Sequence, residues 1–312
     1  MKQMTFQALI DELFRLYPQG KYAEALAVVE QQADNFPEQS ARTTFWKLCL
    51  LSLCGRADDT ISVFRQGLDA GLWWRNDVFN DSDLNAVRDL PAFQRLMDES
   101  QVKYEAARTQ MERDYAVLMP EEPSGNYPML VALHGRNGNK ESNIREWETA
   151  RRKGWLVLLA QSTQPLFPGS YCWDDPAQGL SDLLFYYKNV SSKNPVDRQR
   201  IVLAGFSQGS GMAIHTTLSG GIAAHGFISI ASWWHKPASL FPQTEAAKRV
   251  RGYFITGEKD HTFDTAREIQ KVLKANNIRF DEETHTDLAH EFPTDFEKSF
   301  DRAIDFIFKE RE

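Results

Sequence analysis

The pentapeptide at residues 205–209 places one serine between two glycines at the end of an apolar run. Its sequence is Gly-Phe-Ser-Gln-Gly, which matches the pattern G-x-S-x-G. Small residues on either side of Ser207 allow a tight strand-to-helix turn that lifts the serine hydroxyl clear of the sheet edge in a strained conformation. The alternative is a glycine-rich turn whose serine only caps a helix. The β-type segment before the motif and the helical segment after it favour Ser207 as a nucleophile.

A serine hydroxyl needs a base to take its proton and an acid to orient that base. In a strand–turn–helix site of this kind, the three groups follow one another along the chain as serine, acid and histidine. Asp260 follows the apolar run at 252–256, and His290 follows the run at 278–280 and a loop. We therefore predict that Asp260 is the orienting acid and that His290 is the base.

Nearby residues offer alternatives to this assignment. His285 is the second candidate for the base, but it falls at the edge of the last predicted strand, and His261 directly follows the acid and is expected to point elsewhere. Glu258 and Asp264 are weaker candidates for the acid. A metal site built on His285 and His290 is a further alternative, but their spacing of five fits neither one helix face nor the HExxH arrangement. We expect no metal site.

Two main-chain N–H groups are candidates for stabilising the negative charge that develops on a substrate oxygen. One belongs to Gln208, which begins the helix after the serine. The other belongs to Arg136, in the loop 134–138 after the apolar run 129–133. His134 opens this loop and is counted among the residues expected around the substrate. We expect its imidazole to fix the loop by hydrogen bonds rather than to take part in the chemistry.

Alternating β-type and helical segments from about residue 115 onward must position these groups. Strands are predicted at 116–119, 129–133, 155–160, 201–204, 226–230, 252–256 and 278–280. Helices are predicted at about 141–153, 177–190, 209–218, 264–275 and 293–309. The middle strands are almost continuously apolar, which is typical of parallel strands covered by helices on both faces. The alternation predicts a twisted, mostly parallel open sheet in an α/β domain at 111–312.

The first 110 residues show a helical period instead. Apolar side chains from Phe6 to Tyr17 recur at steps of three and one, which places them on one helical face. Further helices are predicted at about 22–35, 41–53 and 58–70. The pattern that starts at Gly20 returns at Gly55, an offset of 35 residues that resembles a tetratricopeptide repeat. Two copies are too few to be stable alone. We therefore predict an all-helical, TPR-like domain at 1–110 that packs on the rest of the chain, on a protein partner or on a second copy.

Composition limits the other classes of function. The 312 residues carry a net charge of -7 with 42% hydrophobic and 25% charged residues, which suits a soluble globular protein and disfavours a broad nucleic-acid surface. The three cysteines do not form a disulfide framework, and no apolar stretch is long enough for a transmembrane segment. No secretory signal is evident, so the expected location is cytoplasmic. No dinucleotide-binding or phosphate-binding glycine motif occurs, so no cofactor is expected.

Residues 115–311 resemble an α/β-hydrolase, closest to the phospholipase/carboxylesterase (acyl-protein thioesterase-like) branch. The motifs that carry the resemblance are Leu133-His134-Gly135, Gly205-Phe206-Ser207-Gln208-Gly209-Ser210-Gly211-Met212-Ala213, Gly257-Glu258-Lys259-Asp260 and His290-Glu291-Phe292-Pro293. The resemblance implies the α/β-hydrolase fold, the triad of Ser207, Asp260 and His290, and main-chain donors at Arg136 and Gln208. The chain departs from the family at Arg136, where the residue is often apolar, and at Ala289, where glycine is common. An arginine there favours an anionic or polar substrate if it faces the site, and otherwise points to solvent.

Aromatic residues on two loops are candidates for contact with the substrate. Trp173 lies between a predicted strand and a helix, and Trp233 and Trp234 follow the strand at 226–230. Loops after parallel strands line the crevice of an open sheet. The alternative is that each tryptophan braces its loop from the core. A contact with the substrate would suit a small or aromatic acyl group better than a long lipid chain.

Three functions fit these observations. The first is a serine hydrolase that cleaves small-molecule carboxylic esters or thioesters through an acyl-enzyme. The second is a serine peptidase or amidase of the same fold, since one triad serves both reactions. The third is a catalytically silent scaffold whose helical domain binds a protein. A scaffold has no need of serine, acid and histidine together, and esters need less help with the leaving group than amides. We therefore predict the first function.

Overall fold

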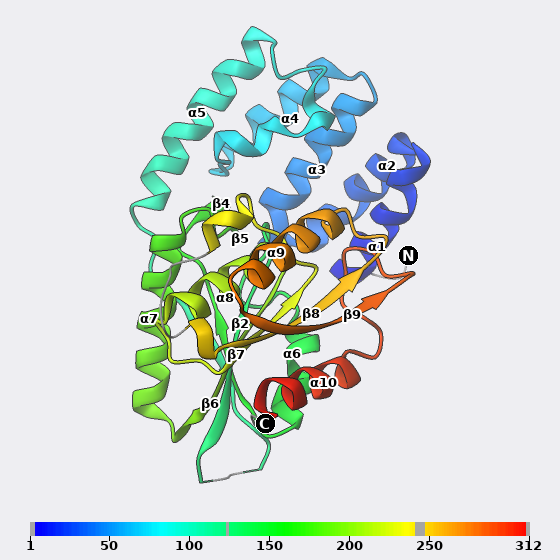
Figure 1. The fold of residues 1–312 in the computed structure, drawn as a ribbon. Coiled ribbons are helices and arrows are strands. Elements are labelled where there is room, and N and C mark those ends of the chain that lie inside the picture. The colour runs from blue at the N-terminus through cyan, green and yellow to red at the C-terminus, as the bar shows by residue number, and fades with distance from the viewer. Residues whose placement is uncertain (1–3, 123–124, 241–246, 310–312) are drawn as a thin grey trace. The chain divides into compact units, whose positions relative to one another are not determined.

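The computed structural model describes residues 4–122, 125–240 and 247–309 (Figure 1). The chain forms two compact units. One consists of Met1–Met111 with Pro165–Ser170, and the other consists of Glu112–Gln164 with Tyr171–Glu312. Among the described residues, none of the helices combines the length and the apolar character that crossing a membrane requires.

The first unit is helical. Its α-helices are α1 (Phe6–Leu16), α2 (Tyr22–Gln32), α3 (Ser40–Leu53), α4 (Ala57–Asp69) and α5 (Pro91–Arg108). Short 3₁₀ helices join them at Tyr17–Gln19, Ala33–Asn35, Pro37–Gln39, Asn76–Asn80 and Ser82–Leu84. Each α-helix packs on the next one along the chain. Four fully buried aromatic rings form the centre of this unit between α4 and α5: Phe64, Trp74, Phe79 and Phe93.

A short segment from much later in the chain also belongs to the first unit, which the sequence did not predict. Strand β4 (Pro165–Phe167) pairs with β5 (Ser170–Tyr171) in a two-stranded sheet. The Arg75 N–H donates a hydrogen bond of 2.7 Å to the Leu166 carbonyl, and the Phe45 ring stacks on Phe167. The helical unit is therefore completed by residues that interrupt the sequence of the second unit.

The second unit contains a seven-stranded sheet in the order β1-β3-β2-β6-β7-β8-β9. Its strands are β1 (Tyr115–Leu118), β2 (Tyr127–Leu133), β3 (Leu156–Ala160), β6 (Val196–Phe206), β7 (Gly226–Ile230), β8 (Arg251–Gly257) and β9 (Arg279–His285). All neighbouring strands are parallel except β1, which pairs antiparallel with β3. The predicted α/β fold with a mostly parallel sheet is confirmed.

Helices cover both faces of this sheet (Figure 1). One face packs against α7 (Pro176–Lys193), α8 (Gln208–Ser219) and α9 (Phe263–Ala275), and the other packs against α6 (Ile144–Arg152) and α10 (Phe296–Phe308). Short 3₁₀ helices lie at Pro237–Leu240 and Ala247–Arg249. In β6, Ile201 and Leu203 enter the first core, whereas Val202 and Ala204 enter the second. The strands are continuously apolar because successive side chains are buried on opposite faces.

Two strands extend beyond their predicted bounds. Strand β6 begins at Val196 rather than at about 201, and its first five residues are exposed or half-buried. Strand β9 runs to His285, and its side chains alternate between exposed and half-buried. Strand β9 lies at the edge of the sheet, where one side of its ladder and much of its surface face solvent, and the added residues of the central strand β6 are themselves exposed or half-buried, so neither segment has a strong apolar signal. The apolar pattern therefore located both strands but not their ends.

Glycines allow backbones to meet at the edge where the parallel strands end. A Cβ at Gly205 would collide with the Gly209 carbonyl, and a Cβ at Gly209 would collide with the His134 carbonyl. The turn after β6 can therefore lie directly on the loop after β2. This contact depends on the absence of side chains at both positions.

We predict that Gly209→Ala destabilises the second unit by about 1–3 kcal/mol, because the added methyl group forces the loop after β2 away from the turn. Gly125→Ala is the matched control, since a Cβ at Gly125 meets no atom within 4 Å. Urea unfolding followed by tryptophan fluorescence measures both variants. Equal stability of the two variants would contradict the prediction.

Candidate active site

Ser207 occupies the sharp turn between β6 and α8 in a strained backbone conformation. Its φ of 55° and ψ of -122° lie in a region that residues other than glycine rarely adopt, at a cost of about 1–3 kcal/mol. Its N–H donates to the Ile230 carbonyl at 2.9 Å, and its own carbonyl accepts from the N–H groups of Ser210 at 3.0 Å and Trp233 at 3.3 Å. These bonds hold the strained backbone in place. The Ser207 side chain remains half-buried at the surface.

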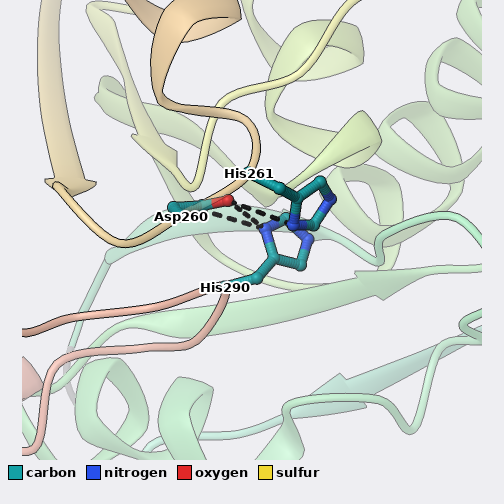
Figure 2. Close-up of side chains that lie close together, drawn as sticks. All are labelled: Asp260, His261 and His290. Atoms are coloured by element: carbon teal, nitrogen blue, oxygen red, sulfur yellow. Dashed lines mark hydrogen bonds and ion pairs between the residues drawn. The ribbon is translucent and has the colours of Figure 1, made fainter. Parts of the chain in front are cut away.

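Asp260 and His290, the predicted acid and base, form a hydrogen-bonded pair (Figure 2). His290 Nδ1 lies 2.9 Å from Asp260 Oδ1 and 3.0 Å from Oδ2. The Asp260 side chain is 1% exposed, and its Oδ1 also accepts the Thr262 N–H at 2.8 Å. Burial alone would raise the pKa of Asp260, but the hydrogen bonds from His290 and Thr262 outweigh it and leave the pKa below its ordinary value. The carboxylate is therefore ionised at neutral pH and orients the imidazole.

Backbone contacts between two loops bring this pair together. The Glu258 N–H donates to the His285 carbonyl at 2.9 Å, and the Lys259 N–H donates to the Leu288 carbonyl at 3.1 Å. A Cβ at Gly257 would collide with the same Leu288 carbonyl. The loop that carries Asp260 and the loop that carries His290 are therefore joined by their main chains.

The histidine of this pair lies beside the residue that precedes the serine. The rings of Phe206 and His290 have centroids 4.8 Å apart. Within the described part of the chain, no hydrogen bond joins Ser207 Oγ to His290. Catalytic hydrogen bonds are often long in a site without substrate and shorten in the reacting complex. The structure thus places the three predicted catalytic residues at one edge of the sheet and makes the contact between two of them.

His134 holds the loop after β2 from inside the protein. Its Nδ1 lies 2.8 Å from the Gly135 carbonyl, and its Nε2 accepts the Ser162 N–H at 3.2 Å. The Trp173 indole N–H donates to the His134 carbonyl at 2.9 Å. Burial lowers the pKa of His134 to about 4, against the opposing effect of the Gly135 hydrogen bond. The neutral imidazole satisfies both of its partners, so it positions the loop and carries no charge at neutral pH.

Asp174 joins the two segments that carry the predicted main-chain donors, and sequence reasoning did not single it out. Its carboxylate accepts from Arg136 Nη1 at 2.7 and 2.9 Å and from Gln208 Nε2 at 2.7 Å. Gln208 Oε1 in turn accepts the Trp173 N–H at 2.9 Å. The Arg136 guanidinium is thus paired with Asp174, and both side chains are about one-third exposed. No spacing in the sequence signals this network, because it depends on the conformation of two loops.

Three of the four side chains predicted around the substrate lie in the interior. His134, Trp173 and Trp234 are at most 2% exposed, and the Trp234 indole donates to Ser239 Oγ at 3.1 Å. Trp233 alone among the four is half-buried. Trp173, Trp234 and His134 therefore fit the alternative in which each residue holds its own loop from the core, because their polar side-chain atoms bond to the protein itself.

The two other histidines near the pair differ in their placement. His285 Nε2 lies 3.0 Å from Glu283 Oε1, so the alternative base is held by another carboxylate. His261 was expected to point away from the acid, and this expectation is wrong. Its Nδ1 lies 3.5 Å from Asp260 Oδ1, and its ring centroid lies 4.4 Å from that of His290 (Figure 2). The irregular loop after β8 turns successive side chains to the same side.

The low pKa of His134 predicts a pH-dependent stability. An unfolded histidine has a pKa near 6.5, so between about pH 6.5 and 4 the unfolded chain binds more protons than the folded one. Stability from this residue is present above pH 6.5 and falls by about 2 kcal/mol from pH 7.5 to pH 5. Urea unfolding at these two pH values measures the loss.

His134→Gln isolates the contribution of this residue, because burial lowers the pKa of His215 and His225 as well. We expect the variant to be less stable at pH 7.5 but to lose about 2 kcal/mol less on acidification than the unmodified protein does. An identical loss in both proteins would show that His134 does not titrate in this way.

Two family models match parts of this chain. Residues 5–108 match the model described as the N-terminal domain of A/B hydrolase-like proteins, and residues 186–309 match the phospholipase/carboxylesterase model. No curated protein matches the chain at a significant level.

Solved structures share the fold at low sequence identity. An uncharacterized protein from Bacillus cereus ATCC 10987 aligns over 98% of this chain and 99% of its own, with 23% identity and a TM-score of 0.54. The Bacillus cereus carboxylesterase aligns over 65% of this chain and 99% of its own, with 16% identity and a TM-score of 0.51. Zea mays acyl-protein thioesterase 2 aligns over 61% and 97%, with 15% identity and a TM-score of 0.50. Together with the two family matches, these folds confirm the predicted resemblance to α/β-hydrolases of the phospholipase/carboxylesterase type, preceded by a region similar to the A/B hydrolase-like N-terminal domain.

Proposed function

We propose that this chain is a serine hydrolase that cleaves carboxylic esters or thioesters, with Ser207 as nucleophile, His290 as base and Asp260 as the orienting acid. One observation carries the proposal. The half-buried His290, paired with the buried Asp260, lies against Phe206, and the next residue is a serine held in a strained turn. Strain at a single polar residue, beside a paired histidine and carboxylate, is typical of a site built for covalent catalysis.

The pairing with Asp260 prepares His290 to accept a proton. Because the ionised carboxylate faces Nδ1, the neutral imidazole carries its hydrogen there and leaves a lone pair on Nε2. As Ser207 Oγ attacks the carbonyl carbon of the substrate, its proton moves to Nε2. The imidazolium that forms is stabilised by the adjacent carboxylate.

Main-chain N–H groups stabilise the oxygen of the tetrahedral intermediate in this proposal. Gln208 begins α8, and the N–H groups in the first turn of a helix have no acceptor within that helix. The N–H of Arg136 is the second donor. In the same loop, the N–H groups of Asn137 and Gly138 donate to the Tyr171 and Gly135 carbonyls at 3.0 Å and are occupied. Asp174 accepts hydrogen bonds from both the Arg136 and the Gln208 side chains and so links the two segments that carry these donors.

The reaction then proceeds through an acyl-enzyme. The imidazolium returns its proton to the leaving alcohol or thiol, and the acyl group stays on Ser207 Oγ. Water attacks this ester with His290 again as the base, and the carboxylic acid leaves as Ser207 regains its proton. Water is the only cosubstrate.

The surroundings of Ser207 favour a small or aromatic acyl group. The Trp233 side chain is half-buried. The main-chain N–H of Trp233 donates to the Ser207 carbonyl, so Trp233 lies next to the proposed nucleophile. The Arg136–Asp174 pair adds a polar, charge-balanced surface at the loop that carries the second donor. Neither feature suits a wide lipid groove.

We expect a fluorophosphonate probe to label the unmodified protein and to fail with Ser207→Ala, because the probe reacts only with an activated serine. Ser192→Ala is the matched control, since Ser192 is exposed on α7 and its hydroxyl donates a hydrogen bond to the Asn189 carbonyl of the same helix. A panel of acetyl, octanoyl and aryl esters, a thioester and an aminoacyl amide should show turnover of short or aryl esters and thioesters. Absence of labelling in the unmodified protein would favour a scaffold, and preference for the amide would favour a peptidase.

Asp260→Asn should lower kcat by about 10³–10⁴-fold, because an amide favours the wrong tautomer of His290 and does not stabilise its charged form. Asp264→Asn is the matched control: Asp264 is exposed in the first turn of α9, four residues along the chain, and was the weaker candidate for the acid. Hydrolysis of an aryl ester measures both variants. Similar rates for the two would remove Asp260 from the proposed triad.

A further inference from the structure

His261 brings a second imidazole to the Asp260–His290 pair, and the proposed reaction does not use it. Its side chain is 74% exposed, and Figure 2 shows its ring beside that of His290, with both rings directed at the Asp260 carboxylate. One ligand atom from each residue lies within 4.8 Å of the other two. Within the described residues, the His261 ring makes no hydrogen bond, and its ion-pair contact joins Nδ1 to Asp260 Oδ1 at 3.5 Å.

Two imidazole nitrogens and one carboxylate oxygen form a donor set that zinc prefers. In a tetrahedral site with bonds of about 2.0–2.1 Å, neighbouring ligand atoms lie about 3.3–3.4 Å apart. The distance from Asp260 Oδ1 is 3.5 Å to His261 Nδ1 and 2.9 Å to His290 Nδ1. A small opening of the pair would therefore admit the ion, and the exposed side of His261 gives it a path from solvent.

We propose that a zinc ion binds Asp260, His261 and His290 and thereby inhibits the hydrolase. The inhibition rests on the proposed function, whereas the binding of zinc does not. The fourth ligand in this arrangement is water.

Inhibition follows from where His290 carries its single hydrogen. In the active form the hydrogen is on Nδ1, facing Asp260, and the lone pair is on Nε2. Zinc takes the lone pair of Nδ1, so the hydrogen of the neutral ring moves to Nε2 through solvent and no proton is lost overall. A nitrogen that already carries hydrogen cannot accept the proton of Ser207. The charge of the ion also opposes formation of an imidazolium beside it.

The donor set also predicts which ions act. Magnesium prefers oxygen ligands and loses its water reluctantly. We expect zinc at micromolar concentration to inhibit, magnesium at the same concentration to have no effect, and a chelator to restore activity. The probe ions are therefore a matched pair of equal charge.

Isothermal titration calorimetry with Zn²⁺, in a buffer that does not bind metals, tests the site without relying on turnover. We expect one zinc ion per chain and at least a tenfold loss of affinity in His261→Gln. His235→Gln is the control, because His235 is another exposed histidine in the same unit and lies outside the cluster. Hydrolysis of an aryl ester and fluorophosphonate labelling of Ser207 are then measured with and without zinc, each relative to the same variant without metal.

Each outcome supports or overturns a defined part of the proposal. The proposal is supported if zinc inhibits ester hydrolysis by the unmodified protein and by His235→Gln, and if His261→Gln needs at least a tenfold higher zinc concentration for the same inhibition. Equal zinc affinity in His261→Gln overturns the site, and zinc binding that leaves labelling unchanged overturns the inhibition. A protein that binds zinc through His261 but neither hydrolyses esters nor reacts with the probe overturns the proposed function and leaves the metal site standing.

Discussion

The site depends on how closely three stretches of backbone approach one another at the edge where the parallel strands end. Side chains are excluded at Gly205 and Gly209, where the turn after β6 meets the loop after β2, and at Gly257, where β8 meets the loop before His290. Parallel strands end at the same edge, but loops of ordinary residues would be held apart by their side chains. The glycines remove that separation. They therefore set the positions of Ser207, Asp260 and His290, the proposed nucleophile, acid and base, before any side chain contributes a hydrogen bond.

Within that frame, burial has opposite consequences for two polar groups. It lowers the pKa of His134 and keeps the ring neutral, because the neutral form already satisfies a donor and an acceptor. It would raise the pKa of Asp260, but hydrogen bonds to the ionised form prevail. A buried group is thus charged or neutral according to which of these two protonation states its neighbours satisfy with hydrogen bonds. One group becomes a structural support and the other an anion that can orient a base.

The sequence predicted those features that depend on residues close together along the chain. The runs at 129–133 and 226–230 were recognised because both faces of each strand are buried, and the pattern around Ser207 was recognised because the turn itself requires glycine. The sequence did not predict the association of Pro165–Ser170 with the helical unit, since three-residue strands have no distinctive period.

Contacts made through irregular loops were also missed. Asp174 holds both Arg136 and Gln208, but its neighbours in the sequence give no sign of either contact. His261 was misplaced because side chains on a loop do not follow the alternation of a strand. Burial of Trp173 and Trp234 could not be distinguished from contact with a substrate, because both interpretations require an aromatic residue on a loop after a strand.

The two histidines of the hydrolase motifs show why the three-dimensional contacts, rather than the residue types, decide chemical roles. His134 and His290 both direct Nδ1 at an oxygen atom, so both carry their hydrogen on the same nitrogen. In His134 the remaining lone pair, on Nε2, accepts the Ser162 N–H, so both ring nitrogens already have partners within the protein. In His290, the described residues provide no donor for Nε2. Because a base needs an unoccupied lone pair as well as an orienting partner, His134 is limited to holding its loop, whereas His290 keeps a lone pair on Nε2 that suits the role of base proposed for it.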